Sequence, residues 1–513
     1  MHSYHTLKIS GLFESIDLRG ISIKQAYNDH AYIEIEGIAP PGLAEQCMKE
    51  RLDNEPICLV SYPADVGNKQ ETIFHGFIRK AAIRHTGGVY HIRIEGVSHS
   101  YFLDVLRESR SFQQTSQTFD DVIETVMKGT GCQYINSDER QSEPIGSFVL
   151  QWNETNWMFI KRLVSRHNVG LIPDIRSETP SFEVGLPIAI KEYALLDSHP
   201  YECFRMPMAA KERIENQRIC GVDENDFLCY FFPSQLEQYC LGDRVHFQGL
   251  PLRIVRINSY LDRKDAVLRH DYTCTTEEGS KQPLFYNTQI QGMSLESTVI
   301  GRRKDYAKVH LFSVDKQQDD CDAMWFRQSA SYTAGKDGGW CAMPELGDML
   351  NLHFPTSDEN DCYLMNSKQS SYEETTCPSI NAVSAKMTSP KTTGMNSNKA
   401  PSATPSSKFL IAPNKQSMLL DDGMICFSSS GGASTLTLSP FGIQVNTDGD
   451  INMSAKSGIS FGKPSKTGGI PAKGLNLYSM QNVIIVCDDS SIVLNHETGI
   501  ANHYAVEIHL LPE

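Results

Sequence analysis

The 513-residue sequence has no long hydrophobic run and little positive charge. Nowhere do about 18 apolar residues follow one another, so no helix is expected to span a bilayer. The N-terminus has no basic region followed by an apolar stretch, so no signal peptide is expected. The 47 Lys and Arg residues face 62 Asp and Glu residues, which gives a formal net charge of −15. Because such a surface repels phosphates and anionic headgroups, we expect no nucleic acid partner and no lasting attachment to a membrane.

The cysteines lack the spacing of a disulfide scaffold or a zinc site. All 14 are spread singly between Cys47 and Cys487, without a Cys-x-x-Cys pair. Secreted disulfide scaffolds are short and dense in cysteine, and structural zinc needs ligands that are paired at short spacing. We therefore expect reduced, buried thiols in a protein made in the cytoplasm.

The motifs of common enzymes and metal sites are also missing. No Gly-x-Ser-x-Gly, P-loop, Gly-x-Gly-x-x-Gly or His-Glu-x-x-His pattern occurs, so we expect no catalytic residue and no cofactor. Two candidate ligand clusters lack the order that binding requires, since one has no His-x-His pair and the other lacks the glycine of a calcium loop. We expect no bound metal and a solvated surface at both clusters: His496, His503, His509, Asp319, Asp320 and Asp322.

Composition changes along the chain and divides it into parts. The last arginine is Arg327, so 186 residues follow without one. Between Asn366 and Lys408 nearly every second residue is Ser, Thr or Pro, which is typical of a linker because such a stretch buries little apolar surface. We predict a mainly β, multidomain protein with a front part (1–285), a small barrel (286–366), a linker (367–408) and a repeat region (409–513).

The front part has the alternation of half-buried strands. Apolar residues alternate with polar neighbours in four places, and Gly87-Gly88 predicts a hairpin turn. The alternating pairs are Leu7 and Ile9, Ile21 and Ile23, Ile33 and Ile35, and Ile92 and Ile94.

Two helices are predicted between these strands. Thr118 and Asp121 resemble a capping box with Asp in place of Glu, and an apolar helical pattern follows them. Asn153 is predicted to cap a second helix, whose apolar face consists of Trp157, Ile160 and Val164.

The next segment suits a small barrel. Residues 289–366 contain short strands around Val309, Phe326, Met349 and Tyr363, separated by glycine turns. Such a length and pattern favour a five-stranded barrel of the oligonucleotide/oligosaccharide-binding (OB) type.

An eight-residue apolar repeat marks the end of the chain. Isoleucines step by eight, most of them followed two residues later by a second apolar residue, with a looser stretch at 462–474. Positions i and i+2 of a strand point the same way, so each octad offers a two-residue apolar face and then turns. The residues assigned to this face are Ile443, Val445, Ile451, Met453, Ile459, Phe461, Ile484, Val486, Ile492, Leu494, Ile500, Asn502, Ile508 and Leu510.

One such ribbon is too thin to bury its own face, so it must stack on copies of itself. We predict an intertwined homotrimeric β-prism with these residues along its axis, in preference to an ordinary antiparallel meander. At Asn502 two readings stay open: a ring of three hydrogen-bonded amides on the axis, which could also hold water or an ion, or a solvated residue on a frayed strand.

In collinear order, these parts resemble VgrG-type spike proteins of contractile injection systems and the hub-plus-spike of contractile phage tails. The octads resemble the family's needle, and Gln151–Leu163 resembles its aromatic helix motif that ends in Arg-Leu. Further matching segments are Ile73–Ile78, Phe102–Leu103, Arg110–Gln113, Arg303–Val309, Trp325–Arg327, Gly339–Trp340 and Met343–Asp348.

The resemblance implies a structural baseplate hub with a membrane-puncturing needle. Its implied partners are two further copies of the chain, the hexameric inner-tube protein, other baseplate proteins, a PAAR-type tip protein and effector cargo. The tip protein would dock at Ile508 and Leu510. The protein would be assembled in the cytoplasm and ejected, and it would touch a membrane only during puncture. Two alternatives remain: an enzyme-bearing hub (a peptidoglycan hydrolase or toxin carrier) and a tail-fibre-like adhesin.

Overall fold

The computed structural model divides the chain into two compact units, Met1–Ser371 and Tyr372–Glu513, which we treat separately. It describes residues 2–49, 52, 55–62, 69–187, 192–194, 199–216, 219, 221–303, 306–315, 322–329, 332–334, 338–340, 344, 346–365, 408–411, 416–421, 423–429, 433–440, 442–453, 482–487, 490–495 and 501–504. The fold is mainly β with a few helices and several separate sheets, as the sequence predicts.

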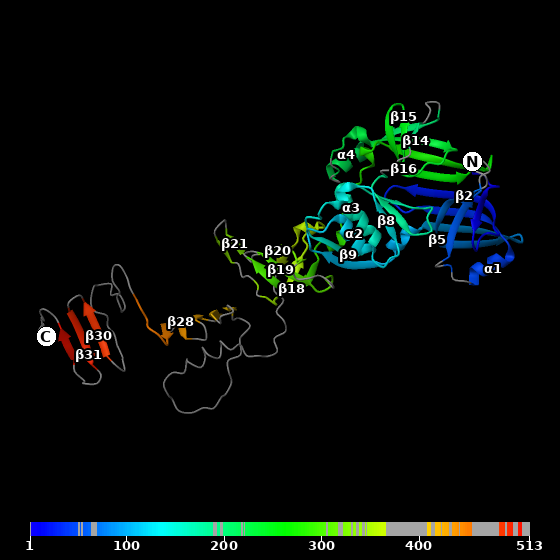
Figure 1. Ribbon diagram of the computed structural model, residues 1–513. Coiled ribbons are helices and arrows are strands. Elements are labelled where there is room, and N and C mark those ends of the chain that lie inside the picture. The colour runs from blue at the N-terminus through cyan, green and yellow to red at the C-terminus, as the bar shows by residue number, and fades with distance from the viewer. Residues whose placement is uncertain are drawn as a thin grey trace. The chain divides into compact units, whose positions relative to one another are not determined.

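A twelve-stranded sheet dominates the first unit (Figure 1). Its main path runs β1-β4-β5-β6-β3-β2-β16-β17-β14-β13, and β12 and β15 pair beside β16. The strands are β1 (Leu7–Ser10), β2 (Asp17–Ala26), β3 (Tyr32–Ala39), β4 (Pro56–Ser61), β5 (Glu71–Thr86), β6 (Val89–Ser98), β12 (Glu192–Ala194), β13 (Glu202–Arg205), β14 (Leu228–Gln235), β15 (Arg244–Phe247), β16 (Leu250–Leu261) and β17 (Leu268–Thr275).

This sheet has two lobes that meet at β2 and β16. The two strands pair antiparallel, with Ala26 opposite Arg256 and Ser22 opposite Tyr260. On one side β2 continues into the hairpin with β3, and on the other β16 continues into the hairpin with β17. Each lobe has its own apolar core, the first around Ile33 and the second around Phe232.

A third core holds the helices that the sequence predicts. The α-helices are α1 (Pro41–Lys49), α2 (Phe119–Met127), α3 (Asn156–Val164) and α4 (Pro207–Asn216). Helices α2 and α3 pack with β7 (Arg107–Phe112), β8 (Gln133–Asn136), β9 (Val149–Thr155), β10 (Leu171–Pro173) and β11 (Ser181–Val184). The short 3₁₀ helices are η2 (His99–Asp104), η3 (Glu139–Ser142), η4 (Ser165–His167), η5 (Glu224–Phe227), η6 (Glu278–Ser280), η7 (Thr288–Ile290) and η9 (Glu359–Asp361).

The helix caps confirm one prediction and correct another. Thr118 and Asp121 form the predicted capping box of α2, each side chain accepting from the other residue's backbone N–H. The cap of α3 is Thr155 rather than Asn153, because the Thr155 hydroxyl accepts from Met158 N–H. Asn153 lies within β9 with a φ of 49°, a left-handed conformation that asparagine tolerates better than most residues.

The barrel has the strand order expected of the predicted five-stranded type. Its sheet runs β20-β19-β18-β23-β24, and a parallel bridge between Gln328 and Leu364 closes it. The Ser329 N–H donates to the Leu364 carbonyl oxygen at 2.7 Å beside that bridge. The strands are β18 (Ser294–Arg303), β19 (Tyr306–Leu311), β20 (Trp325–Arg327), β23 (Met349–His353) and β24 (Tyr363–Met365), with a hairpin of β21 (Tyr332–Ala334) and β22 (Gly338–Trp340) inserted.

In the second unit, the described strands of each sheet pair antiparallel in chain order. One sheet contains β25 (Lys408–Ile411), β26 (Ser417–Asp421), β27 (Met424–Ser428), β28 (Ser434–Ser439) and β29 (Gly442–Thr447). The other contains β30 (Asn482–Cys487), β31 (Ser490–Asn495) and β32 (Ala501–Tyr504). The described strands of one chain thus form two meanders, and the prism of three chains stays a prediction.

Two further expectations can be compared with the structure. Cys274 and Cys426 are buried thiols as expected, whereas Cys203 is exposed. Among the helices that the structure describes, none is both long enough and apolar enough to cross a membrane.

Candidate functional site

The start of β9 and the residue before it connect the region of α2 and α3 to the barrel by contributing side chains to the barrel's core. Phe148 and Leu150 are fully buried among barrel residues. The Phe148 ring packs edge-on against Phe326, with 5.2 Å between centroids, and stacks near Phe354 at 6.2 Å. The core of the barrel is therefore completed by residues that precede it by about 150 positions in the chain.

A buried ion cluster stands beside this shared core. Arg162 on α3 donates two hydrogen bonds to Glu154, from Nε to Oε1 at 2.9 Å and from a terminal nitrogen to Oε2 at 2.7 Å. Its other terminal nitrogen donates to Glu359 Oε1 of the barrel at 2.5 Å. Arg166 adds a longer contact to Glu359 Oε2 at 3.4 Å. We call Glu154, Arg162, Arg166 and Glu359 the junction cluster.

Two members of the junction cluster, Arg162 and Glu359, keep their charges although they are buried. Burial alone would raise the pKa of Glu359, but the charges of Arg162 and Arg166 hold that pKa below its usual value. Burial likewise opposes the charge of Arg162, and the two carboxylates outweigh it and raise the pKa of the guanidinium. A buried ion pair of this geometry becomes strongly destabilising when one partner is removed, because the other charge stays buried.

A second polar contact ties β7 to the barrel. Gln113 is buried and donates to Asp315 Oδ2 at 2.7 Å, and it accepts from Met324 N–H at 3.0 Å. The Ser111 hydroxyl also donates to the Asp315 carboxylate. Burial raises the pKa of Asp315, although these donors oppose that rise. The barrel is thus held at two separate places, by the junction cluster and by the contacts of Asp315.

The second unit offers a different kind of surface, an apolar face of β26–β29. The strand register aligns two cross-strand rows two residues apart, and opposite residues on neighbouring strands share a face. One row consists of Met418, Phe427, Leu436 and Val445, and the other of Leu420, Ile425, Leu438 and Ile443. We call these rows the apolar face.

Much of the apolar face is open to solvent in a single chain. Ile443 is 72% exposed and Val445 is 50% exposed, and Phe427 beside them is 41% exposed. Ile451 and Met453, which follow β29, are also exposed. An exposed apolar surface of this extent marks an interaction site.

The octad pattern identified only the last strand of this face. Met418, Leu420, Ile425, Phe427, Leu436 and Leu438 were missed by the sequence analysis, although they also form apolar pairs at i and i+2. The distance between successive pairs varies from strand to strand, so a search for a fixed period of eight cannot find them. The pairs themselves were the available signal.

In β30–β32 the strand pairing suggests an alternative to the octad assignment, which stays a prediction. Ile492 is opposite Ile485, and Leu494 is opposite Val483 and Ala501. Positions 484, 486 and 502 therefore alternate with the row that contains 492 and 494, instead of continuing it. Ile459, Phe461, Ile500, Ile508 and Leu510 lie outside the described residues.

The candidate metal ligands are not brought together in the described part of the chain. Its residues include no group of three or more His, Cys, Asp or Glu side chains that could hold a metal ion. Of the residues considered from the sequence, His503 lies in β32 and Asp322 precedes β20. His496, His509, Asp319 and Asp320 lie outside the described residues.

A known protein family resembles the front part of the chain. Residues 46–170, which include β9 and α3, match the model of the phage tail baseplate hub family (GPD). A search of curated proteins found no match.

Solved structures extend the likeness. The E. coli c3393 protein, a type VI secretion system component with structural similarity to the T4 bacteriophage tail proteins gp27 and gp5, aligns with a TM-score of 0.50 at 14% identity over 71% of this chain and all of that one. A chain of the lidded Francisella PdpA-VgrG complex aligns with a TM-score of 0.53 at 7% identity, covering 86% of this chain and 79% of that one. The lidless PdpA-VgrG complex gives 0.51 at 7% identity, with coverages of 86% and 98%.

These likenesses define the class of fold. The chain has the mainly β, multidomain fold of phage-tail hub proteins. Within that class it resembles VgrG-type spike proteins, which confirms the resemblance drawn from the sequence motifs.

Proposed function

We propose that the protein is the hub and spike of a contractile injection machine and works as a homotrimer. The apolar face of β26–β29 carries this proposal, because a single chain leaves it exposed. Three copies that faced one another would bury these rows around a common axis. A polar outer surface would then remain for passage through an envelope.

The two lobes of the large sheet support a role as an adaptor to the tube. They are joined side by side at β2 and β16, and each has a separate core. Three chains with two lobes each would present six similar surfaces to a hexameric inner tube. Around this ring we also place the other baseplate proteins as partners.

The junction between the region of α2 and α3 and the barrel supports a mechanical role. A pushed spike must pass its load from the hub into the barrel without a hinge. Phe148 and Leu150 in the shared core, the junction cluster and Gln113 would provide that stiffness. We infer that the chain's task is structural rather than enzymatic, in keeping with the structural tail-hub proteins that it matches.

The end of the chain completes the proposal. In this reading the needle punctures the target envelope, and Ile508 and Leu510 receive a PAAR-type tip protein. The protein is assembled in the cytoplasm and is ejected with effector cargo into a target cell or the extracellular space. Contact with a membrane is limited to the moment of puncture.

The mass of the protein in solution tests the trimer. Sedimentation equilibrium should give three times the chain mass of 57.4 kDa. Val445→Asp should reduce that mass or make the trimer dissociate at low concentration, because three carboxylates would meet in a dry interface. Gln444→Asp is the matched control, since it lies next to Val445 on the opposite face. A monomeric wild type, or equal behaviour of the two variants, would overturn the proposal.

A further inference from the structure

A cavity of about 420 Å³ lies in the second lobe of the large sheet, and its lining residues include no member of the junction cluster. Residues from the end of β2, from β13, β14, β16 and β17, and from α4 line it. Its volume is within the range of about 300–1,000 Å³ that is usual for ligand pockets. The cavity is therefore large enough for one or two side chains of a partner.

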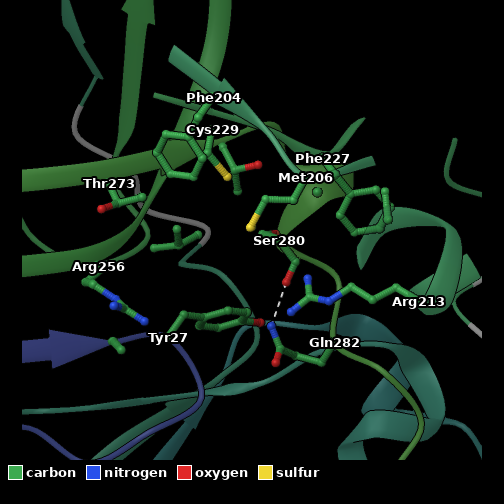
Figure 2. Close-up of a pocket in the computed structure, with 15 residues that line it drawn as sticks. Tyr27, Phe204, Met206, Arg213, Phe227, Cys229, Arg256, Thr273, Ser280 and Gln282 are labelled. Carbon is green, nitrogen blue, oxygen red and sulfur yellow. Dashed lines mark hydrogen bonds between the residues drawn. The ribbon is translucent and has the colours of Figure 1, made fainter. Parts of the chain in front are cut away.

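Two arginines supply the charge of this cavity. Arg213 on α4 and Arg256 on β16 both line it, and its lining residues include no Asp or Glu. In the part of the chain that the structure describes, neither guanidinium forms an ion pair. Figure 2 shows the two arginines approaching from opposite sides, with Tyr27 and Gln282 between them in this view. In a chain with a net charge of −15, a cavity lined by cations without carboxylates is a distinct feature.

The polar groups between the arginines already have partners. Gln282 donates from Nε2 to the Ser280 carbonyl oxygen at 2.8 Å, and its Oε1 accepts from Asn28 Nδ2 at 2.9 Å. The Ser280 hydroxyl donates to the Glu277 carbonyl oxygen at 2.6 Å. Gln282 and Ser280 are therefore held in place by hydrogen bonds within the protein. The two arginines remain as hydrogen-bond donors for a ligand.

The walls of the cavity are apolar. Phe204, Met206 and Phe227 line it together with Cys229. The Arg213 guanidinium lies over the Phe227 ring, 5.7 Å from its centroid, which holds the charge at the edge of the apolar wall. Met206 is 52% exposed at the rim, where a ligand would cover it.

We propose that this cavity binds an extended segment of a partner protein in which a carboxylate lies beside an apolar side chain. Guanidinium groups bind carboxylates with two parallel hydrogen bonds, and the apolar neighbour would cover Phe204, Met206 and Phe227. A lone phosphate would satisfy the arginines but leave these walls open. This inference does not depend on the trimer, because all lining residues come from one chain.

Peptides test the proposal on the full-length protein. The probes are four pools of acetylated, amidated decapeptides with random flanks and a fixed central pair: Glu-Leu, Gln-Leu, Glu-Ser or Gln-Ser. We expect the Glu-Leu pool to bind at least about tenfold more tightly than each other pool. It alone has both a carboxylate for the arginines and an apolar side chain for the apolar walls. Equal binding of the Glu-Leu and Gln-Leu pools would overturn the proposal. Binding of inorganic phosphate without binding of any peptide pool would also overturn it, in favour of a phosphate site.

Variants locate the binding in the cavity. Arg213→Gln combined with Arg256→Gln should abolish the preference for Glu-Leu, whereas Arg84→Gln combined with Arg263→Gln should retain it, because those exposed arginines lie elsewhere. The first pair should fold normally, since neither side chain loses an ion pair with a described residue.

Charge reversal at the rim gives an independent test. Met206→Glu places a carboxylate beside the arginines and should weaken Glu-Leu binding at least about tenfold. Met208→Glu is its control, because Met208 lies two residues further on in the first turn of α4, is 78% exposed and does not line the cavity. Unchanged affinity in Met206→Glu would place the binding elsewhere and overturn the proposal.

Discussion

The two units of the chain differ in how far their apolar side chains are buried within a single chain. In the first unit Ile33, Phe74 and Phe232 are almost completely buried within one chain. In the second, Ile443 and Val445 are exposed, although their strand β29 pairs along its length with β28. The strands named here are therefore paired on at least one side in both units, but only the first unit buries these apolar side chains. This difference is what we expect if one unit folds on its own contacts and the other is completed by the proposed trimer.

The largest expected effect is loss of assembly from a single charge in the second unit. The register of β30 and β31 predicts that position 485, not 484, continues the row of Ile492. Ile485→Asp should therefore destroy the trimer's resistance to mild detergent, and Ile484→Asp should affect it less. Detergent gels and sedimentation of the two variants measure this. The reverse order of the two effects would restore the octad assignment.

The second largest effect is expected on the stability of the first unit, and the proposed trimer should not change. Glu359→Gln leaves Arg162 and Arg166 buried without their shared carboxylate, so it should lower the free energy of unfolding by about 3–5 kcal/mol. All four tryptophans (Trp152, Trp157, Trp325 and Trp340) belong to the first unit, so their fluorescence follows its unfolding in the intact chain.

Glu139→Gln is the control for this variant, since Glu139 is exposed. Both proteins should have the same sedimentation mass as the wild type. If Glu359→Gln dissociated the trimer, the proposed independence of the two units would be wrong.

A smaller effect is expected from pH. His75 Nδ1 lies 2.5 Å from His99 Nε2, and burial together with the neighbouring His75 lowers the pKa of His99 from 6.5 to about 4. Because the unfolded chain takes up this proton first, the first unit should lose stability as the pH falls from about 6.5 towards 4.

Tryptophan fluorescence during heating at several pH values measures this loss. In His99→Gln the fall in unfolding temperature over that range should be smaller than in the wild type. An identical fall in both proteins would show that other buried groups, such as His270, control it.

Local patterns in the sequence predicted local structure well. The alternation at Ile21 and Ile23 and the Thr118 box were confirmed, because strand period and cap chemistry depend on residues a few positions apart. The cap of α3 was misplaced by two residues, since Asn153 and Thr155 are both good caps and only the φ of Asn153 separates them.

Long-range structure could not be predicted in the same way. The pairing of Arg162 with Glu359 joins residues that are 197 positions apart, and no local pattern indicates it. The cavity around Arg213 and Arg256 is likewise assembled from segments between Ala26 and Gln282. On β30 four consecutive apolar residues, Val483–Val486, left the octad count with two possible registers, and only strand pairing distinguishes them.

The smallest expected effect tests whether the caps belong to the self-sufficient unit. Thr118→Ala removes one side of the capping box of α2 and should lower the free energy of unfolding by about 1 kcal/mol. Thr155→Ala should lower the free energy of unfolding by more than this, because Thr155 caps α3 and its hydroxyl also donates to the Asp104 carboxylate. Tryptophan fluorescence in urea measures both changes, and sedimentation should show unchanged trimers. If Thr155→Ala lowered the free energy of unfolding less than Thr118→Ala does, the prediction of Asn153 as the cap of α3 would be restored.

Since α3 carries Arg162, a loosened α3 should also affect the junction cluster. Glu359→Gln should therefore lower the free energy of unfolding less when it is combined with Thr155→Ala than it does alone.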